Sequence, residues 1–488
     1  MKSSIFNISI SMKKYFLFLI VSLLGLSSCE KILDKEPTDK ISLEDLFLDV
    51  QGAKTALAGS YRALLDENHY NKNTMVYPEI LAGNIKFSKN TNLRLEDIYE
   101  AIVDSQNSSM NGTYSSLYSE LNNVNNIIKY TPTAAGSTTD KTKIIAEAKA
   151  IRALIHFDLV RIFARPFNYT SNGSHLGIPV ILQPQLYSDP APTRATVAET
   201  YNAIINDLTE AIAAFDDTNV GVLNSGTKQN YFTKTSTKAL LAKVYLYQNN
   251  WDRAFALADE IIKSNQYTLI TNANYVASWT GRVPSSESIF ELPVETNFTG
   301  GGLGVYYEAS NLSSYRMYAA TLDLTGLYST TDVRNINSMF NRIDISGVNY
   351  AFTKKYQGGG TLATPIKILR LSELHLIRAE AAVEKNAADF TTANADLNLI
   401  RKRGDVSANT LNLTTKDAVI DAILLERRKE LAFEGNLLFD LMRRKKDITR
   451  VDVTPVAKNL LTDDDRLIMP LPANTVNANK NMKQNPGY

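Results

Sequence analysis

The chain has 488 residues, and 44% of them are hydrophobic, which is enough to bury a substantial core. Its formal net charge is +1, and the only charged residues before position 29 are Lys2, Lys13 and Lys14, so the rest of the chain is near −2. This balance argues against nucleic acid as a partner, because nucleic acid binding needs a strongly basic surface. The single cysteine, Cys29, excludes a disulfide within the chain.

Residues 1–28 have the composition of a signal peptide. Two lysines precede an apolar run over residues 15–26, and two serines stand directly before Cys29. The run is shorter than the roughly 20 apolar residues that cross a bilayer, and no later segment reaches that length. We therefore expect the protein to be soluble after residue 28. We expect translation to start at Met12, because the signal is complete from there.

The letters "LSSC" before and including Cys29 resemble the bacterial lipobox, in which the cysteine carries a diacylglycerol and is acylated on its amine after cleavage. The alternative is an ordinary signal cut near Ser28 that leaves a free thiol. We expect lipidation at Cys29, because an unpaired cysteine in an exported protein is a liability. Several acyl chains on one N-terminus suffice for stable anchoring. Residues 29–42 would then form a tether, and residues 43–488 a single domain.

Helical patterns dominate three regions of that domain. The first covers residues 43–65, 114–130 and 143–163. In its last part, apolar residues recur every three or four positions and predict one buried stripe, which ends before Pro166. The residues of this stripe are Ile145, Ala148, Ile151, Ile155, Leu159 and Ile162.

The second and third regions predict pairs of helices. In the second, Thr196 and Glu199 have the spacing of a capping box, and Tyr245 and Ala254 keep the nine-residue offset of a tetratricopeptide repeat. The third has an alanine-rich helix in "LRLSELHLIRAEAAVEKN", a polar turn, and a second helix starting near Thr392. The pairs predict a mostly α, tetratricopeptide-like scaffold.

Three long insertions interrupt this scaffold, at about residues 67–112, 168–194 and 267–365. They are rich in Gly, Asn, Ser and Pro, and the third contains a β-like stretch, "SIFELPV", from Ser288 to Val294. Loops of this length in a compact protein are usually functional.

The carboxylates of Glu426, Glu430 and Glu434 have the spacing of one helix face. They could form an acid/base or metal site, or arginines could neutralise them in the packing between helices. We favour neutralisation, because unpaired like charges at this spacing destabilise a helix. The arginines expected to do so are Arg427, Arg443, Arg401 and Arg378.

No metal or catalytic motif stands out elsewhere. The three aspartates at 463–465 could bind calcium, but a solvated turn is the favoured interpretation. His69, His156, His175 and His375 have no zinc-ligand spacing, and we expect His156 and His375 to be core residues bonded to oxygens. We therefore predict no metal site, and no cofactor apart from the lipid on Cys29.

Ligand contacts are expected from aromatic residues in the insertions, because aromatic faces stack on sugar rings while polar neighbours fix the hydroxyl groups. Trp279 is the foremost candidate, since "NYVASWTGRVPSSES" is polar on both sides. The alternative for each residue is that it only anchors its loop. The candidates are Trp279, Arg282, Tyr306, Tyr307, Tyr315, Phe87, Asn90 and Asn92.

Five motifs in order resemble the SusD/RagB family of nutrient-uptake lipoproteins of Bacteroidetes. They are "CEKILDKEP", "PAPTRATVAETYNAIINDLTEAI", "RLSELHLIRAEA", "ERRKELAFEG" and the terminal "LIMPLPANTVNANKNMKQNPGY". The resemblance covers essentially the whole chain. It departs from the family after Gly435, where Leu437 and Leu438 stand in place of an arginine and an aromatic residue.

The resemblance implies a right-handed superhelical scaffold of tetratricopeptide-like pairs. It also implies a surface-exposed, lipid-anchored outer-membrane protein that is not an enzyme. Such a protein captures oligosaccharide and delivers it to a SusC-like TonB-dependent transporter, on which it closes as a lid. One alternative is the same role with peptide or other cargo, and a remote one is a glycoside hydrolase, which needs two suitably spaced carboxylates.

Overall fold

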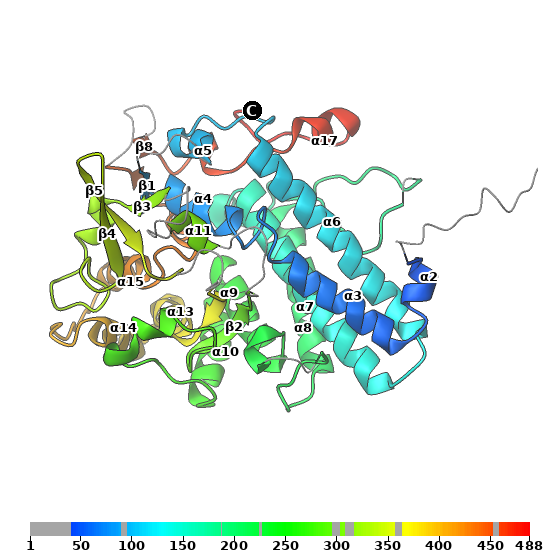
Figure 1. Ribbon diagram of the computed structural model, residues 1–488, viewed down its shortest axis with the longest axis horizontal. Helices are drawn as coiled ribbons and strands as arrows, with labels where there is room; N and C mark the ends of the chain where they lie inside the picture. The colour runs from blue at the N-terminus through cyan, green and yellow to red at the C-terminus, as the bar shows by residue number, and fades with distance from the viewer. Residues whose placement is uncertain are drawn as a thin grey trace, which may run out of the picture. The chain divides into compact units, whose positions relative to one another are not determined.

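The computed structural model (Figure 1) describes residues 41–88, 95–186, 188–223, 227–294, 303–307, 317–356, 364–451 and 458–488. The expected signal peptide, Cys29 and most of the expected tether lie outside these residues. The chain divides into two compact units, Met1–Leu46 and Phe47–Tyr488. The described part of the first unit contains the short helix α2 (Leu43–Leu46), and all elements below belong to the second.

Helix α7 (Thr138–Phe163) is the central helix of the N-terminal half. Helices α3 (Val50–Ala63), α6 (Ser108–Tyr130) and α8 (Val197–Ala214) pack against it, and α3, α6 and α7 run side by side in Figure 1. Every residue from Ala150 to Val160 is buried. The predicted single stripe is therefore too narrow, because neighbours on several sides cover the whole circumference of this helix.

The capping box predicted at the start of α8 is confirmed. The backbone N–H of Glu199 donates to Thr196 Oγ1 at 3.1 Å, and the Thr196 N–H donates to the Glu199 carboxylate at 2.8 Å. Two N–H groups that lack helical partners are thereby satisfied.

Helices α9 (Lys234–Tyr247) and α10 (Trp251–Lys263) form the pair that the tetratricopeptide offset predicts. Tyr245 is 4% exposed and Ala254 is fully buried. Asn249, in the turn between the helices, has φ 61°, a left-handed conformation that asparagine tolerates better than most residues. The offset therefore identified a real helix pair.

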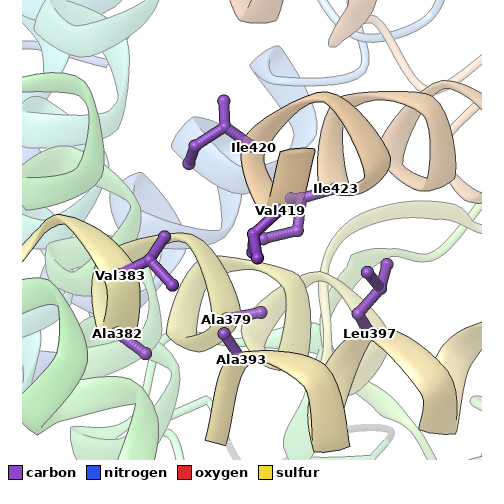
Figure 2. Packing of buried hydrophobic residues seen from close by; sticks show 8 residues of the cluster. All are labelled: Ala379, Ala382, Val383, Ala393, Leu397, Val419, Ile420 and Ile423. Atoms are coloured by element: carbon purple, nitrogen blue, oxygen red, sulfur yellow. The ribbon is translucent and has the colours of Figure 1, made fainter. Parts of the chain in front are cut away.

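A second pair, α13 (Leu371–Glu384) and α14 (Phe390–Gly404), packs with α15 (Lys416–Glu430). Figure 2 shows the contact, in which Val419 and Ile423 of α15 lie over Ala379 of α13. Small alanine side chains let these helices approach closely, and the branched side chains of α15 fill the remaining space.

The insertions contain regular elements as well as loops. A four-stranded antiparallel sheet has the order β1-β3-β5-β4, and β2 pairs separately with β6, also antiparallel. Strand β2 confirms the β-like stretch seen in the sequence. The strands are β1 (Ile85–Phe87), β2 (Ser288–Leu292), β3 (Tyr318–Ala320), β4 (Phe340–Ile345), β5 (Val348–Thr353) and β6 (Ile366–Arg370).

Short elements complete the described chain, and together with the helix pairs they confirm the mostly α fold with minor β structure. They are α4 (Asn73–Leu81), α5 (Glu96–Glu100), α11 (Leu303–Tyr307), α12 (Leu322–Thr325), α16 (Leu437–Arg443), α17 (Ala473–Ala478), β7 (Ile448–Thr449) and β8 (Asn459–Leu460).

The three glutamates of the C-terminal motif lie in a buried network of ion pairs. Glu430, the last residue of α15, is 0% exposed and accepts from Arg334 at 2.8 Å and from Arg370 and Arg403 at 2.5 Å each. Arg334 also pairs with Glu426 at 2.7 Å. Burial alone would raise the pKa of Glu430, but the three arginines hold it well below its usual range.

Neutralisation by arginine is thus confirmed, although the arginines differ from those expected. Arg427 pairs instead with Glu373 and Asp440. Arg334 and Arg370 come from the third insertion and the strand that follows it, far from the glutamates in sequence. Glu434 lies beyond the end of the helix, where it pairs with Arg370 at 2.8 Å and Lys355 at 2.6 Å.

Glu430→Gln should lower the free energy of unfolding by about 3–5 kcal/mol, because it leaves three buried guanidinium groups without their shared carboxylate. Chemical denaturation measures this loss. As a control, Asp421→Asn removes the exposed ion pair with Lys446 and should cost less than about 1 kcal/mol. Equal losses in the two variants would contradict a structural role for the network.

Candidate functional site

Strands β1 and β3 bring the first and third insertions together. Phe87 is paired with Tyr318 in the sheet, and the N–H of Ser88 donates to the carbonyl of Met317 at 2.9 Å. The segments that contain Asn90, Asn92 and Tyr315 adjoin these two bonded positions in sequence, although they lie outside the described residues. Strands β1 and β3 therefore pair described residues of the first and third insertions with one another.

Four aromatic residues form an edge cluster at this place: Phe87, Tyr99, Tyr306 and Tyr318. The ring of Phe87 lies edge-on to Tyr99 at 4.7 Å between centroids, and 5.7 Å from Tyr318. Tyr306 lies 5.8 Å from Tyr318. Phe87 and Tyr99 are half-buried, whereas Tyr306 and Tyr318 are buried. The Arg450 guanidinium lies 5.9 Å from the centre of the Tyr99 ring, so Phe87 is the member of the cluster that is best placed to meet a ligand.

Polar groups border the edge cluster. Lys72 Nζ lies 2.6 Å from a carboxylate oxygen of Glu67 and 5.4 Å from the centre of the Tyr306 ring. The Tyr306 hydroxyl donates to the same oxygen of Glu67. Tyr306 thus ties a fixed donor and acceptor to the aromatic cluster, a combination suited to binding a polyhydroxylated ligand.

Tyr307 does not share this exposure. Its ring is 0% exposed and stacks on Tyr356 at 5.4 Å. Burial raises the pKa of Tyr307 well above its usual value, so its phenol stays protonated. Tyr307 packs in the core next to Tyr318 of the edge cluster, and it is too buried to contact a ligand.

Trp279 also lies in the core, at 2% exposure. The Nζ atoms of Lys367 and Lys355 lie 4.3 and 4.7 Å from its ring centre, and burial lowers the pKa of both lysines. Protein cations therefore occupy the ring that we expected a sugar to cover. The loop-anchor alternative replaces the binding interpretation for this residue. Arg282 is exposed and donates to the carbonyl of Val294 at 2.7 Å.

Tyr99 and Tyr318 are members of the edge cluster that the sequence did not single out. Tyr318 could have been found from its strand, since "YAA" follows a polar loop directly. Tyr99 lies in α5, within a run of acidic residues that reads as a solvated turn, and only its packing against Phe87 reveals it.

The other sequence candidates have structural partners. Asp464 accepts from Arg466 at 2.9 Å, and Asp465 from Arg165 at 2.8 Å. Across the described ranges, no group of three or more His, Cys, Asp or Glu side chains is placed to hold a metal ion.

The two histidines expected in the core are buried there. His375 Nδ1 lies 2.7 Å from the Asp396 carboxylate, as expected of a histidine bonded to an oxygen. His156 Nε2 instead accepts from the N–H of Ile181 at 3.2 Å. Burial lowers the pKa of His156 to about 3 and keeps it neutral.

Trp279→Ala should lower the free energy of unfolding by about 3–5 kcal/mol, because it removes a large buried side chain and leaves a cavity beneath two lysines. Thermal and chemical denaturation test this, with Arg282→Ala as the exposed neighbour that should stay within about 0.5 kcal/mol of the unaltered protein. If the stability of the Trp279→Ala protein is unchanged, Trp279 is not a core residue, and the interpretation of Trp279 as a ligand-binding residue at the surface would stand again.

Two family models match the chain. The SusD family model matches residues 299–488, and a model described as "Starch-binding associating with outer membrane" matches residues 31–246. Among the described residues, no helix is long and apolar enough to cross a membrane.

Individual proteins match over nearly the full length. SusD-like protein P38 of Formosa agariphila is 26% identical over 99% of both chains. A SusD superfamily protein of Bacteroides thetaiotaomicron superimposes with a TM-score of 0.80, at 26% identity over 90% of this chain and 100% of the other. A candidate sugar binding protein of Bacteroides vulgatus superimposes with a TM-score of 0.76, at 28% identity over 90% of this chain and 99% of the other. The chain therefore belongs to the SusD/RagB family.

Proposed function

We propose that this protein binds carbohydrate at the outer membrane without cleaving it, and that it delivers oligosaccharide to a SusC-like TonB-dependent transporter. The observation that carries the proposal is the edge cluster, where half-buried aromatic rings and a Lys72–Glu67 pair border segments of both insertions. The starch-binding description of the matching family model and the sugar-binding relative support the ligand class.

Binding would use the Phe87 and Tyr99 rings as platforms for the apolar C–H faces of sugar rings. The more exposed Glu67, held in place by Lys72, would accept from hydroxyl groups. The candidate residues Asn90, Asn92 and Tyr315 would add contacts from the adjoining parts of the insertions. Each contact is modest in free energy, which suits cargo that has to be released to a transporter.

Phe87→Ala should weaken oligosaccharide binding by about 2- to 12-fold, equivalent to roughly 0.5–1.5 kcal/mol of ring contact. Titration calorimetry with maltoheptaose, xylohexaose and laminarihexaose measures the affinity. Tyr169→Ala, which removes a 51% exposed ring elsewhere, is the control and should bind normally. Unchanged affinity in Phe87→Ala would count against the edge cluster as the site. Release of reducing ends would instead indicate a hydrolase, and binding of peptides alone would favour the peptide alternative.

Cys29→Ala should move the protein from the membrane fraction to the soluble fraction, because the acceptor for the lipid is lost. Fractionation and lipid labelling of cells that express the two forms measure this. The unaltered protein, extracted in mild detergent, should copurify with a large TonB-dependent barrel. Retention and labelling of the Cys29→Ala form would refute the lipid anchor, and repeated absence of the barrel would refute the partner.

A further inference from the structure

A second open site lies on the helical side of the molecule, apart from the residues of the edge cluster. It is a cleft of about 810 Å³, lined by α3, the start of α7, the segment 220–223 and residues 230–231. We call it the α3 cleft. Its volume is in the range of small-molecule sites, roughly 300–1,000 Å³. Its lining mixes apolar side chains such as Val220 with polar ones such as Gln51 and Asn230.

The aromatic wall of the α3 cleft is held in one position. The half-buried ring of Tyr231 lies edge-on to Tyr61, with 5.2 Å between centroids and 84° between planes. Gly221 packs so close that a Cβ there would lie 2.7 Å from the Cβ of Tyr231. The absence of a side chain at Gly221 therefore lets this loop pack directly against Tyr231.

A buried carboxylate is hydrogen-bonded to two of the segments that line the α3 cleft. Glu147 of α7 is 0% exposed and accepts from the Tyr61 hydroxyl at 2.7 Å and from the N–H of Val222 at 2.6 Å. The Tyr61 hydroxyl accepts in turn from the N–H of Phe232 at 2.8 Å. Glu147 and the Tyr61 hydroxyl together thus connect α3, α7 and both loop segments, which is the support that a preorganised site requires.

Three cations line the α3 cleft, and each has an interaction partner in the protein: Lys54 and Lys143 pair with carboxylates, and Arg62 is also engaged. Lys54 Nζ lies 2.7 Å from the Asp140 carboxylate, and Lys143 Nζ lies 2.8 Å from Asp216. Because each ammonium group already has a carboxylate partner, an anionic ligand would have to displace that partner. Each pair presents donors and acceptors together, as neighbouring hydroxyl groups on a sugar require.

We propose that the α3 cleft is a second carbohydrate site, which binds a short segment of neutral oligosaccharide with Tyr231 as its aromatic platform. The ligand class rests on the proposed function, whereas the position of the site rests on the geometry of the cleft alone. Two sites on one chain would let the protein hold a longer glycan at two points. Binding at one site would then raise the effective concentration of the glycan at the other, and so increase the overall avidity.

Calorimetry with maltoheptaose, xylohexaose and laminarihexaose tests the proposal through stoichiometry. The unaltered protein should bind at two sites per chain for the glycan that it recognises. Tyr231→Ala should weaken one of these sites by about 10-fold, and Phe87→Ala should affect only the other. Tyr231→Phe keeps the ring and should bind within about 2-fold of the unaltered protein at both sites.

If Tyr231→Ala fails to fold, the double variant Gln51→Ala with Asn230→Ala alters the polar lining without touching the aromatic wall, and it should weaken the same site. One site per chain that is unaffected by changes at Tyr231 or at these polar residues would overturn this proposal and leave the proposed function intact. Absence of binding for all three glycans would contradict both proposals.

Discussion

Glu430 is fully buried where α15 ends, and an ionised carboxylate is stable there only when cations surround it. The arginines that do so come from different parts of the chain. Arg334 lies ahead of strand β4, Arg370 ends β6, and Arg403 is in the last turn of α14. Lys355, just after β5, is bonded to Glu434 and to the carbonyl of Glu430. The β4–β5 hairpin is therefore held by cations before its first strand and after its second.

The hairpin held by these ion pairs is connected to the candidate site through the sheet. Strand β5 pairs with β3, and β3 pairs with β1, whose last residue is Phe87. The position of the edge cluster thus depends on a hairpin that buried ion pairs hold against the helices. The α3 cleft depends on a separate buried carboxylate, Glu147, whose pKa burial raises to about 7. The molecule uses buried carboxylates in both places to connect loops to helices.

The helical part of the fold could be predicted from the sequence because its signals are local. The capping residues Thr196 and Glu199 are three positions apart, and Tyr245 and Ala254 are nine apart, so each pattern reports on neighbours in the structure. The sheet could not be predicted in this way. Strands β1 and β3 have three residues each and are separated by more than two hundred positions, and no periodicity marks so short a strand.

The site was predictable only in part, for a related reason. Phe87 and Tyr306 were found from their insertions, because aromatic residues in long polar loops indicate binding. Trp279 has the same polar flanks, but flanking residues do not report what covers a ring, and here the cover comes from Lys355 and Lys367. The α3 cleft has no motif at all, because its lining comes from separate segments that meet only in the folded chain.

The positions of the network residues along the chain also determine the order in which the ribosome supplies them. Arg334, Arg370 and Arg403 all precede Glu430, so a chain growing from its N-terminus carries three guanidinium groups before their shared carboxylate exists. Asp332, which pairs with Arg334, and Glu287, which pairs with Arg370 and Arg403, come earlier in the chain and offer these cations part of their compensation. Helices α3, α6 and α7 need no residue of this network and can pack earlier. Glu430, which all three arginines share, is therefore made after each of them, and only α15 supplies it.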